Sequence, residues 1–266
     1  MTEILVFPAV GVLAGLLAGL FGVGGGLVVV PALVFIYEAQ GFAPAHVTHL
    51  AIGTSLAVIV PTAVSSLLAH HRRGAVDPGL LARLVPPVCV GALAGAWLAA
   101  RVSAGGLRFF FGLFEIAVAL QMLASVHYRP HFGRPGVAAS WFAGLVIGGV
   151  SALLGIGGGT LTVPFLVWCS VPMVRAVGTS AALGLPIALA GAAGFLFMGL
   201  GVPDLPAGST GFIYWPAWAG VALGAVAFAP HGARLAHALR PVMLKRGFAL
   251  MLALVGAKMA FFGLGS

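Results

Sequence analysis

Gly22-Val23-Gly24-Gly25-Gly26 interrupts the first apolar part of the chain, and Gly155-Ile156-Gly157-Gly158-Gly159 repeats it almost unchanged. A proline follows each copy, Pro31 and Pro164, and the differences 155 − 22 and 164 − 31 both equal 133. Near-consecutive glycines in apolar sequence break a helix and bare backbone amides. In lipid, such backbone is tolerated only where protein buries it or where it lines a water-filled cavity. The repeated pentapeptide therefore predicts broken helices inside a membrane and the place of a binding site.

The composition is that of an integral membrane protein. Of the 266 residues, 61% are hydrophobic and only 7% are charged, whereas soluble domains carry about 25% charged residues. Spans of about 20 residues each would use most of this length. The composition excludes a water-soluble enzyme and leaves no room for a second, soluble domain.

The charge of the chain is strongly positive, with 13 Lys and Arg against 5 Asp and Glu, a net charge of +8. A bias of basic residues toward cytoplasmic loops explains this balance, and an attraction for anionic substrates is compatible with it. The basic residues are scattered through short loops, so we expect no nucleic-acid partner. We find no nucleophile with a placed base, no complete metal-ligand cluster and no nucleotide-binding loop, so we expect no enzyme activity, no metal and no cofactor.

Ten apolar stretches can be recognised, and two of them are short. At 1.5 Å per residue, the 11 residues of 27–37 or 160–170 span about 17 Å, roughly half of a hydrocarbon core of about 30 Å. A helix that turns back at each glycine break is therefore expected. The stretches are 4–21, 27–37, 47–69, 79–100, 107–127, 137–154, 160–170, 175–200, 212–230 and 243–264.

The basic loops predict the direction of each stretch. If the chain starts outside and each short stretch counts as a reversal, the basic loops at 70–83, 129–134 and 234–246 all lie in the cytoplasm. The turn with Arg101 and Arg108 is the exception. Each half then holds five segments, an odd number, so the halves are inverted relative to each other. The predicted fold is an all-α polytopic membrane protein of two inverted-topology repeats, residues 1–135 and 136–266. Each repeat has one Gly-broken helical hairpin plus three transmembrane helices.

A second duplicated motif supports the repeat and adds hydroxyl groups. Gly53-Thr54-Ser55 recurs as Gly178-Thr179-Ser180, at an offset of 125 (178 − 53). Helix N-termini at the breaks can hold an anion with backbone amides, and nearby hydroxyls can donate to it. Close helix packing at the glycines and hydroxyl bonds back to the helix backbone are the structural alternatives. The predicted substrate-binding residues are Gly24, Gly25, Gly26, Gly157, Gly158, Gly159, Thr54, Ser55, Thr179 and Ser180.

Glu115 is an acidic residue near the middle of the stretch 107–127, where a charge is costly. It is a candidate proton relay. A neutral, structural glutamate, or one paired with Lys258 of the last stretch, is the alternative.

The duplicated glycine motif with Val-Pro and the Ala-Ile-Gly-Thr-Ser motif resemble those of the TauE/SafE sulfite exporter family, also called 4-toluene sulfonate uptake permeases. The resemblance covers essentially the whole chain and implies a multi-pass carrier of the bacterial inner membrane. Its expected substrates are small sulfur-containing anions such as sulfite, organosulfonates or sulfoacetate, moved by alternating access, with export as the expected direction. The alternative is a membrane-embedded channel-like or scaffold component without carrier activity.

Overall fold

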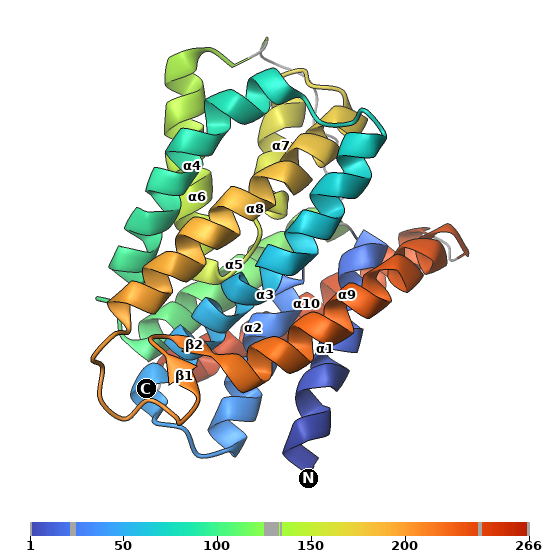
Figure 1. The fold of residues 1–266 in the computed structure, drawn as a ribbon. Helices are drawn as coiled ribbons and strands as arrows, with labels where there is room; N and C mark the ends of the chain where they lie inside the picture. Colours follow the sequence, from blue (N-terminus) through green and yellow to red (C-terminus); the bar gives the residue numbers. More distant parts are fainter. Residues whose placement is uncertain (1, 22–24, 125–132, 134, 239–240, 265–266) are drawn as a thin grey trace.

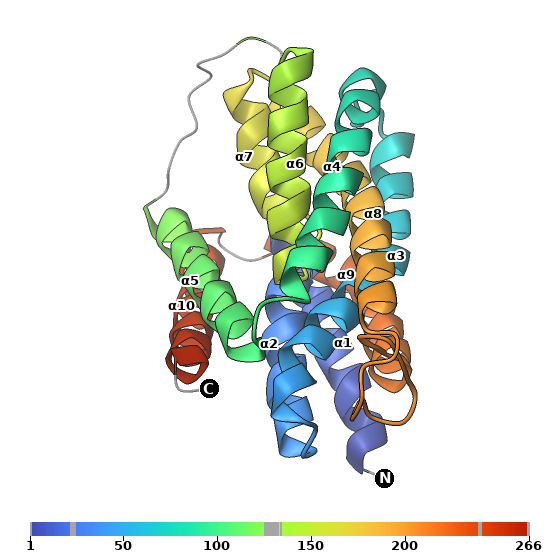
Figure 2. The same ribbon diagram turned by 90° about the vertical axis from the view of Figure 1, so that its left-hand side faces the viewer.

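The protein is a bundle of helices in which segments far apart in the sequence lie side by side (Figures 1 and 2). The computed structural model describes residues 2–21, 25–124, 133, 135–238 and 241–264, and the all-helical prediction is confirmed for them. A small antiparallel hairpin, β1 (Ser209–Thr210) and β2 (Ile213–Tyr214), was not predicted. The helices are α1 (Thr2–Phe21), α2 (Gly26–Ala39), α3 (Pro44–Arg72), α4 (Pro78–Ala99), α5 (Ala104–Leu123), α6 (Val137–Leu154), α7 (Gly159–Trp168), α8 (Met173–Met198), α9 (Trp215–Ala238) and α10 (Pro241–Leu264).

Six helices in the described ranges are long and apolar enough to cross a membrane: α3, α4, α5, α6, α8 and the part Arg246–Leu264 of α10. Their outward faces carry large apolar side chains that no protein covers. Phe142 and Phe261 are each 74% exposed, and Leu223 of α9 is 73% exposed. In water such surface would be unfavourable, so these side chains face lipid.

The two short helices follow the glycine breaks, as the sequence predicted. α2 has 14 residues and α7 has 10. Figures 1 and 2 show that α2 and α7 run from the middle of the molecule toward opposite ends. The orientation of each half relative to a membrane stays a prediction.

The helices of one half pack mainly on those of the other. α1 packs against α9, and α6 packs against α4, so the first helix of each half pairs with the fourth helix of its partner half. Glycines make these approaches close: a Cβ on Gly11 would collide with the Val221 carbonyl, and one on Gly148 with the Val88 carbonyl. Such small-residue interfaces hold helices together in lipid by van der Waals contact.

The two Gly-Thr-Ser motifs make equivalent hydrogen bonds, each to a loop of the opposite half. The hydroxyl oxygen of Thr54 on α3 accepts from the Tyr214 amide at 3.0 Å, and that of Thr179 on α8 accepts from the Asp77 amide at 2.9 Å. Each bond fixes the loop that leads into the fourth helix of the other half, α9 or α4. The exchange is reciprocal, as in contacts between two copies related by a two-fold axis.

Arg108, which did not fit the predicted charge pattern, forms an ion pair. Its guanidinium on α5 donates to both carboxylate oxygens of Glu38 on α2, with Nη2 3.1 Å from Oε2. Such a two-point fork is the strongest geometry for this pair. Because the positive charge is neutralised locally, Arg108 carries little information about which side of the membrane its turn occupies.

Candidate functional site

The break between α6 and α7 depends on two glycines in left-handed conformations. Gly155 ends α6 with φ of +67°, and Gly158 caps α7 with φ of +75°. Residues with a Cβ rarely adopt such values, so glycine is required at both turns. No side chain caps the first turn of α7. The amides at the start of α7 therefore point out of a helix N-terminus that carries roughly half a positive charge.

Four hydroxyl groups on the helices around this break have no hydrogen-bond partner in the described chain: Ser151 on α6, Thr160 and Thr162 on α7, and Ser180 on α8. Ser151 and Thr162 are fully buried, and Ser180 is 2% exposed. Measured from the position of a Cβ on Gly158, the Ser151 Oγ lies at 3.4 Å and the Thr162 Oγ1 at 3.6 Å.

Ser180 belongs to the face of α8 that meets this break. Gly184, one turn further along α8, approaches the Gly157 carbonyl, and Ile187 contacts Gly158. Positions 180, 184 and 187 lie on one side of a helix because of its 3.6-residue period. The hydroxyl of Ser180 is therefore placed beside the first turn of α7.

The lack of partners is unusual because other hydroxyls of the bundle are satisfied locally. The hydroxyl of Thr62 donates to the Ile59 carbonyl at 2.9 Å, and that of Ser140 donates to the Gly136 carbonyl at 2.9 Å. A buried hydroxyl without a partner costs about 1–3 kcal/mol. Ser151, Thr162 and Ser180 all carry this cost, so they form a group of buried donors that a ligand accepting hydrogen bonds can satisfy.

The chemistry of this cluster suits a small oxyanion. Hydroxyls can donate, the helix dipole favours negative charge, and the amides of α7 add further donors. The groups placed here are neutral, so an anion would be held without a full opposite charge. Such a site can bind an anion and also release it, which a carrier requires.

Several of the other predicted binding residues have structural partners. Gly24 lies outside the described residues. Gly26 packs its Cα against the Gly155 carbonyl, so the two glycine motifs touch. The hydroxyl of Ser55 donates to the same Gly155 carbonyl at 2.8 Å. Together with the loop contacts of Thr54 and Thr179, these bonds give the residues roles in the fold, and their part in binding stays a prediction.

Glu115 is fully buried on α5, and neither carboxylate oxygen has a hydrogen-bond partner in the described structure. Its Cβ lies against Gly256 of α10. The suggested pair with Lys258 is not formed, because the Lys258 ammonium sits 4.1 Å from the centre of the Phe35 ring.

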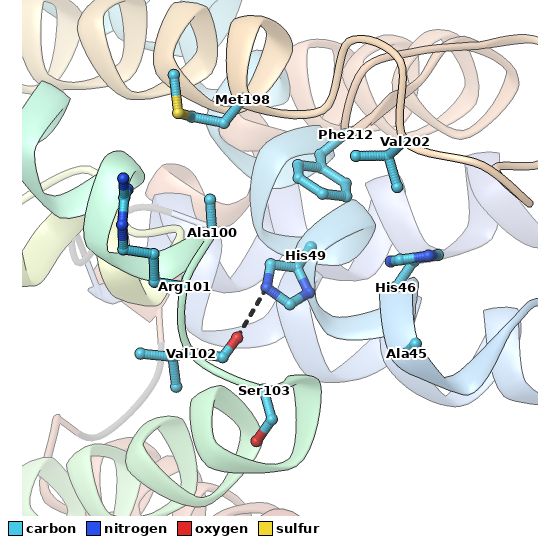
Figure 3. A pocket seen from close by; sticks show the side chains of 10 residues that line it. All are labelled: Ala45, His46, His49, Ala100, Arg101, Val102, Ser103, Met198, Val202 and Phe212. Carbon is cyan, nitrogen blue, oxygen red and sulfur yellow. Dashed lines mark hydrogen bonds between the residues drawn. The ribbon is translucent and has the colours of Figure 1, made fainter.

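A separate pocket of about 400 Å³ opens where α3 begins and α4 ends (Figure 3). Its main polar group is committed: His49 Nε2 lies 3.0 Å from the Ala99 carbonyl and 3.1 Å from the Val102 carbonyl, and its ring stacks on Phe212. Arg101 also borders the pocket, but its guanidinium stacks on Trp97 at 3.5 Å. The pocket therefore presents few free donors, and we assign it no ligand.

Ser151, Thr160 and Thr162 were missed by sequence reasoning. Their signal was present in the repeat, since they stand at positions where the first copy has apolar residues. At the offset of 133, their counterparts are Ala18, Leu27 and Val29. A search for positions that are polar in the second copy and apolar in the first would have found these three residues.

Comparison with known proteins identifies the family. The sequence model described as Sulfite exporter TauE/SafE matches residues 7–259. The chain belongs to the TauE/SafE family. A probable membrane transporter protein of Haemophilus influenzae is 33% identical over 259 residues, covering 97% of this chain and 98% of that protein.

Two further relatives of this TauE/SafE chain carry the description of probable membrane transporter protein. The probable membrane transporter protein MJ0441 of Methanocaldococcus jannaschii is 29% identical over 212 residues, covering 77% of this chain and 73% of that protein. YunE of Bacillus subtilis, also a probable membrane transporter protein, is 31% identical over 202 residues, 66% of this chain and 71% of that protein. No solved structure matches the chain. This TauE/SafE chain is thus a multi-pass membrane transporter and not an enzyme, as the sequence predicted.

Proposed function

We propose that this transporter is a secondary carrier of a small sulfur-containing anion, such as sulfite, an organosulfonate or sulfoacetate, and that it exports this anion across the inner membrane. The observation that carries the proposal is the set of unpartnered hydroxyls at the N-terminus of α7. An SO₃ group has three oxygens that accept hydrogen bonds, and α6, α7 and α8 each carry an unpartnered hydroxyl. The family description supplies the sulfur chemistry.

Alternating access is the transport mode that fits the burial of this site. Ser151 and Thr162 have no exposed surface, so an anion can reach them only if the helices around α7 move. The two repeats, residues 1–135 and 136–266, are the proposed moving parts, because inverted repeats of secondary carriers move against each other about a site near the membrane centre. Energy must come from an ion gradient, the membrane potential or the substrate gradient.

Counterflow in proteoliposomes tests this function. Liposomes loaded with unlabelled sulfite should take up labelled sulfite transiently above equilibrium, and the initial rate should saturate with concentration. A channel would give sulfite flux without saturation or counterflow, and a scaffold component would give no sulfite flux. Either of these results would refute the carrier proposal.

A further inference from the structure

We propose that the anion is recognised by the second half of the protein alone, and that Ser151, Thr160 and Thr162 determine its binding. This inference rests on the proposed transport function but goes beyond it, because the sequence predicted a site shared equally by both glycine breaks. In this proposal the first half contributes apolar packing next to the site and no hydrogen bond to the anion.

The strongest evidence is one pair of equivalent positions. From the Cβ position of Gly158, the Thr162 Oγ1 lies at 3.6 Å, and from that of Gly25, the Val29 Cγ2 lies at 3.7 Å. Both pairs are separated by four residues, and 158 − 25 and 162 − 29 both equal 133. Gly25 is right-handed (φ −70°) and Gly158 is left-handed (φ +75°), yet in both cases the side-chain branch four residues on lies at nearly the same distance. That branch is a hydroxyl in the second half and a methyl in the first.

The surroundings of the two breaks differ in the same sense. Gly25 faces Ala14 and Val29, both apolar and buried. Gly158 faces Ser151 and Thr162, whose hydroxyls are buried and unpartnered. Burying a hydroxyl without a partner is unfavourable, whereas burying a methyl is favourable. The apolar groups around Gly25 thus stabilise the fold by packing, whereas the hydroxyls near Gly158 lower its stability unless a ligand accepts their hydrogen bonds.

The Gly-Thr-Ser serines follow the same division. The hydroxyl of Ser55 is used in its bond to the Gly155 carbonyl. The hydroxyl of Ser180 has no partner. The first half therefore uses its serine to hold the second break in shape, and the second half keeps its serine free beside α7.

The near-isosteric pair Thr and Val provides a matched experiment. Sulfite and methanesulfonate binding would be measured by calorimetry on purified full-length protein, together with the thermal midpoint with and without each anion. Thr162→Val should weaken binding about tenfold or more, as expected when a hydrogen bond to a charged ligand is lost. Ser151→Ala should act in the same direction. Val29→Thr, the same exchange in the first half, should leave the dissociation constant within about twofold of wild type.

The outcomes separate this inference from the transport proposal. In Thr162→Val, the midpoint without anion should be kept or raised while the anion-induced increase is lost, which a purely structural role would not produce. If wild type binds and both Thr162→Val and Ser151→Ala bind equally well, recognition by the second half is wrong while the carrier function stands. An equal loss of anion binding in Val29→Thr would mean that both glycine breaks form the site, which contradicts recognition by the second half alone. If wild type binds neither anion, the transport proposal and this inference both fail.

Discussion

The hydroxyl of Ser55 donates to the carbonyl of Gly155 at 2.8 Å, across a sequence separation of 100 residues. One repeat thereby fixes the left-handed turn that ends α6 in the other. Without this donor, the Gly155 carbonyl would be buried with one bond fewer, at a cost of about 1–3 kcal/mol. The bond explains why a duplicated motif need not have duplicated roles.

Ser55→Ala should therefore lower the stability of the fold by about 1–3 kcal/mol and leave the dissociation constant for sulfite nearly unchanged. Thermal unfolding in detergent and calorimetry measure the two effects. Ser65→Ala, at an exposed position of the same helix, is the control and should stay within about 0.5 kcal/mol of wild type. A loss of binding in a stable Ser55→Ala variant would show that this hydroxyl contacts the anion.

Gly11→Ala should destabilise the pairing of α1 with α9, because the added methyl meets the Val221 backbone carbonyl. Overpacking against backbone costs about 1–3 kcal/mol or more. In α10, Gly247 has nothing within 4 Å of a Cβ, so Gly247→Ala should be neutral or raise stability by up to about 1 kcal/mol. Equal midpoints for the two variants would contradict the close approach of α1 and α9.

Trp218 replaces a hydrogen bond that Pro61 cannot make. Pro61 has no N–H for the Ala57 carbonyl four residues earlier, and the Trp218 indole N–H donates to that carbonyl at 3.0 Å. Trp218→Phe should therefore cost about 1–3 kcal/mol in the native background. In a Pro61→Ala background the helix N–H can supply the bond, so the same change should cost clearly less. A double-mutant cycle on thermal unfolding measures the difference, and additive effects would contradict the substitution of one donor by the other.

The ion pair of Glu38 and Arg108 should couple α2 to α5. Arg108→Lys keeps the charge but loses the two-point fork, so it should lower stability. Arg108 is nearly buried while Glu38 is 40% exposed at its side chain, so solvent screening limits the coupling energy to about 1–2 kcal/mol. A cycle of Glu38→Gln, Arg108→Met and the double variant gives that energy. A coupling energy of zero would mean that the ion pair does not contribute to the stability of the fold.

Glu115→Gln tests the proton relay that the sequence suggested. The change keeps the shape of a protonated carboxyl but cannot carry a proton. In proteoliposomes, it should abolish the response of sulfite flux to an imposed pH gradient and leave sulfite binding intact. Unchanged pH-driven flux would assign Glu115 a structural role between α5 and α10.

Most of the fold could be predicted because its determinants are local in sequence. The two breaks follow from consecutive glycines, and the ten apolar stretches correspond to the ten helices of the described residues, with ends that differ by up to eight residues, at the end of α9. α3 extends to Arg72 and begins at Pro44, beyond the expected 47–69, since helix ends carry polar residues that apolarity cannot detect. The hairpin at 209–214 was missed because its strands have two residues each, too short for a periodic pattern.

The candidate site could be predicted less well, because its chemistry depends on which hydroxyls have no hydrogen-bond partner within the fold. The sequence predicted the helix break at Gly158, which the structure confirms, and the part of this break in binding stays a prediction. It could not show that Thr54 and Thr179 are used on loops of the opposite half, since those partners lie more than 100 residues away. Nor could it show that Lys258 turns to an aromatic ring instead of to Glu115.

The pairing of α1 with α9 has a consequence for biosynthesis. Gly11 leaves the ribosome 210 residues before Val221, the residue whose backbone covers it (221 − 11). At about 5–20 residues per second, α1 waits roughly 10–40 s in the membrane before its partner exists. During that time its small-residue face can meet only lipid, other helices of the nascent chain or a helper protein. The chain is therefore most vulnerable to misassembly while it is being made, and slowing translation between α1 and α9 should lower the yield of folded transporter more than slowing it after α9.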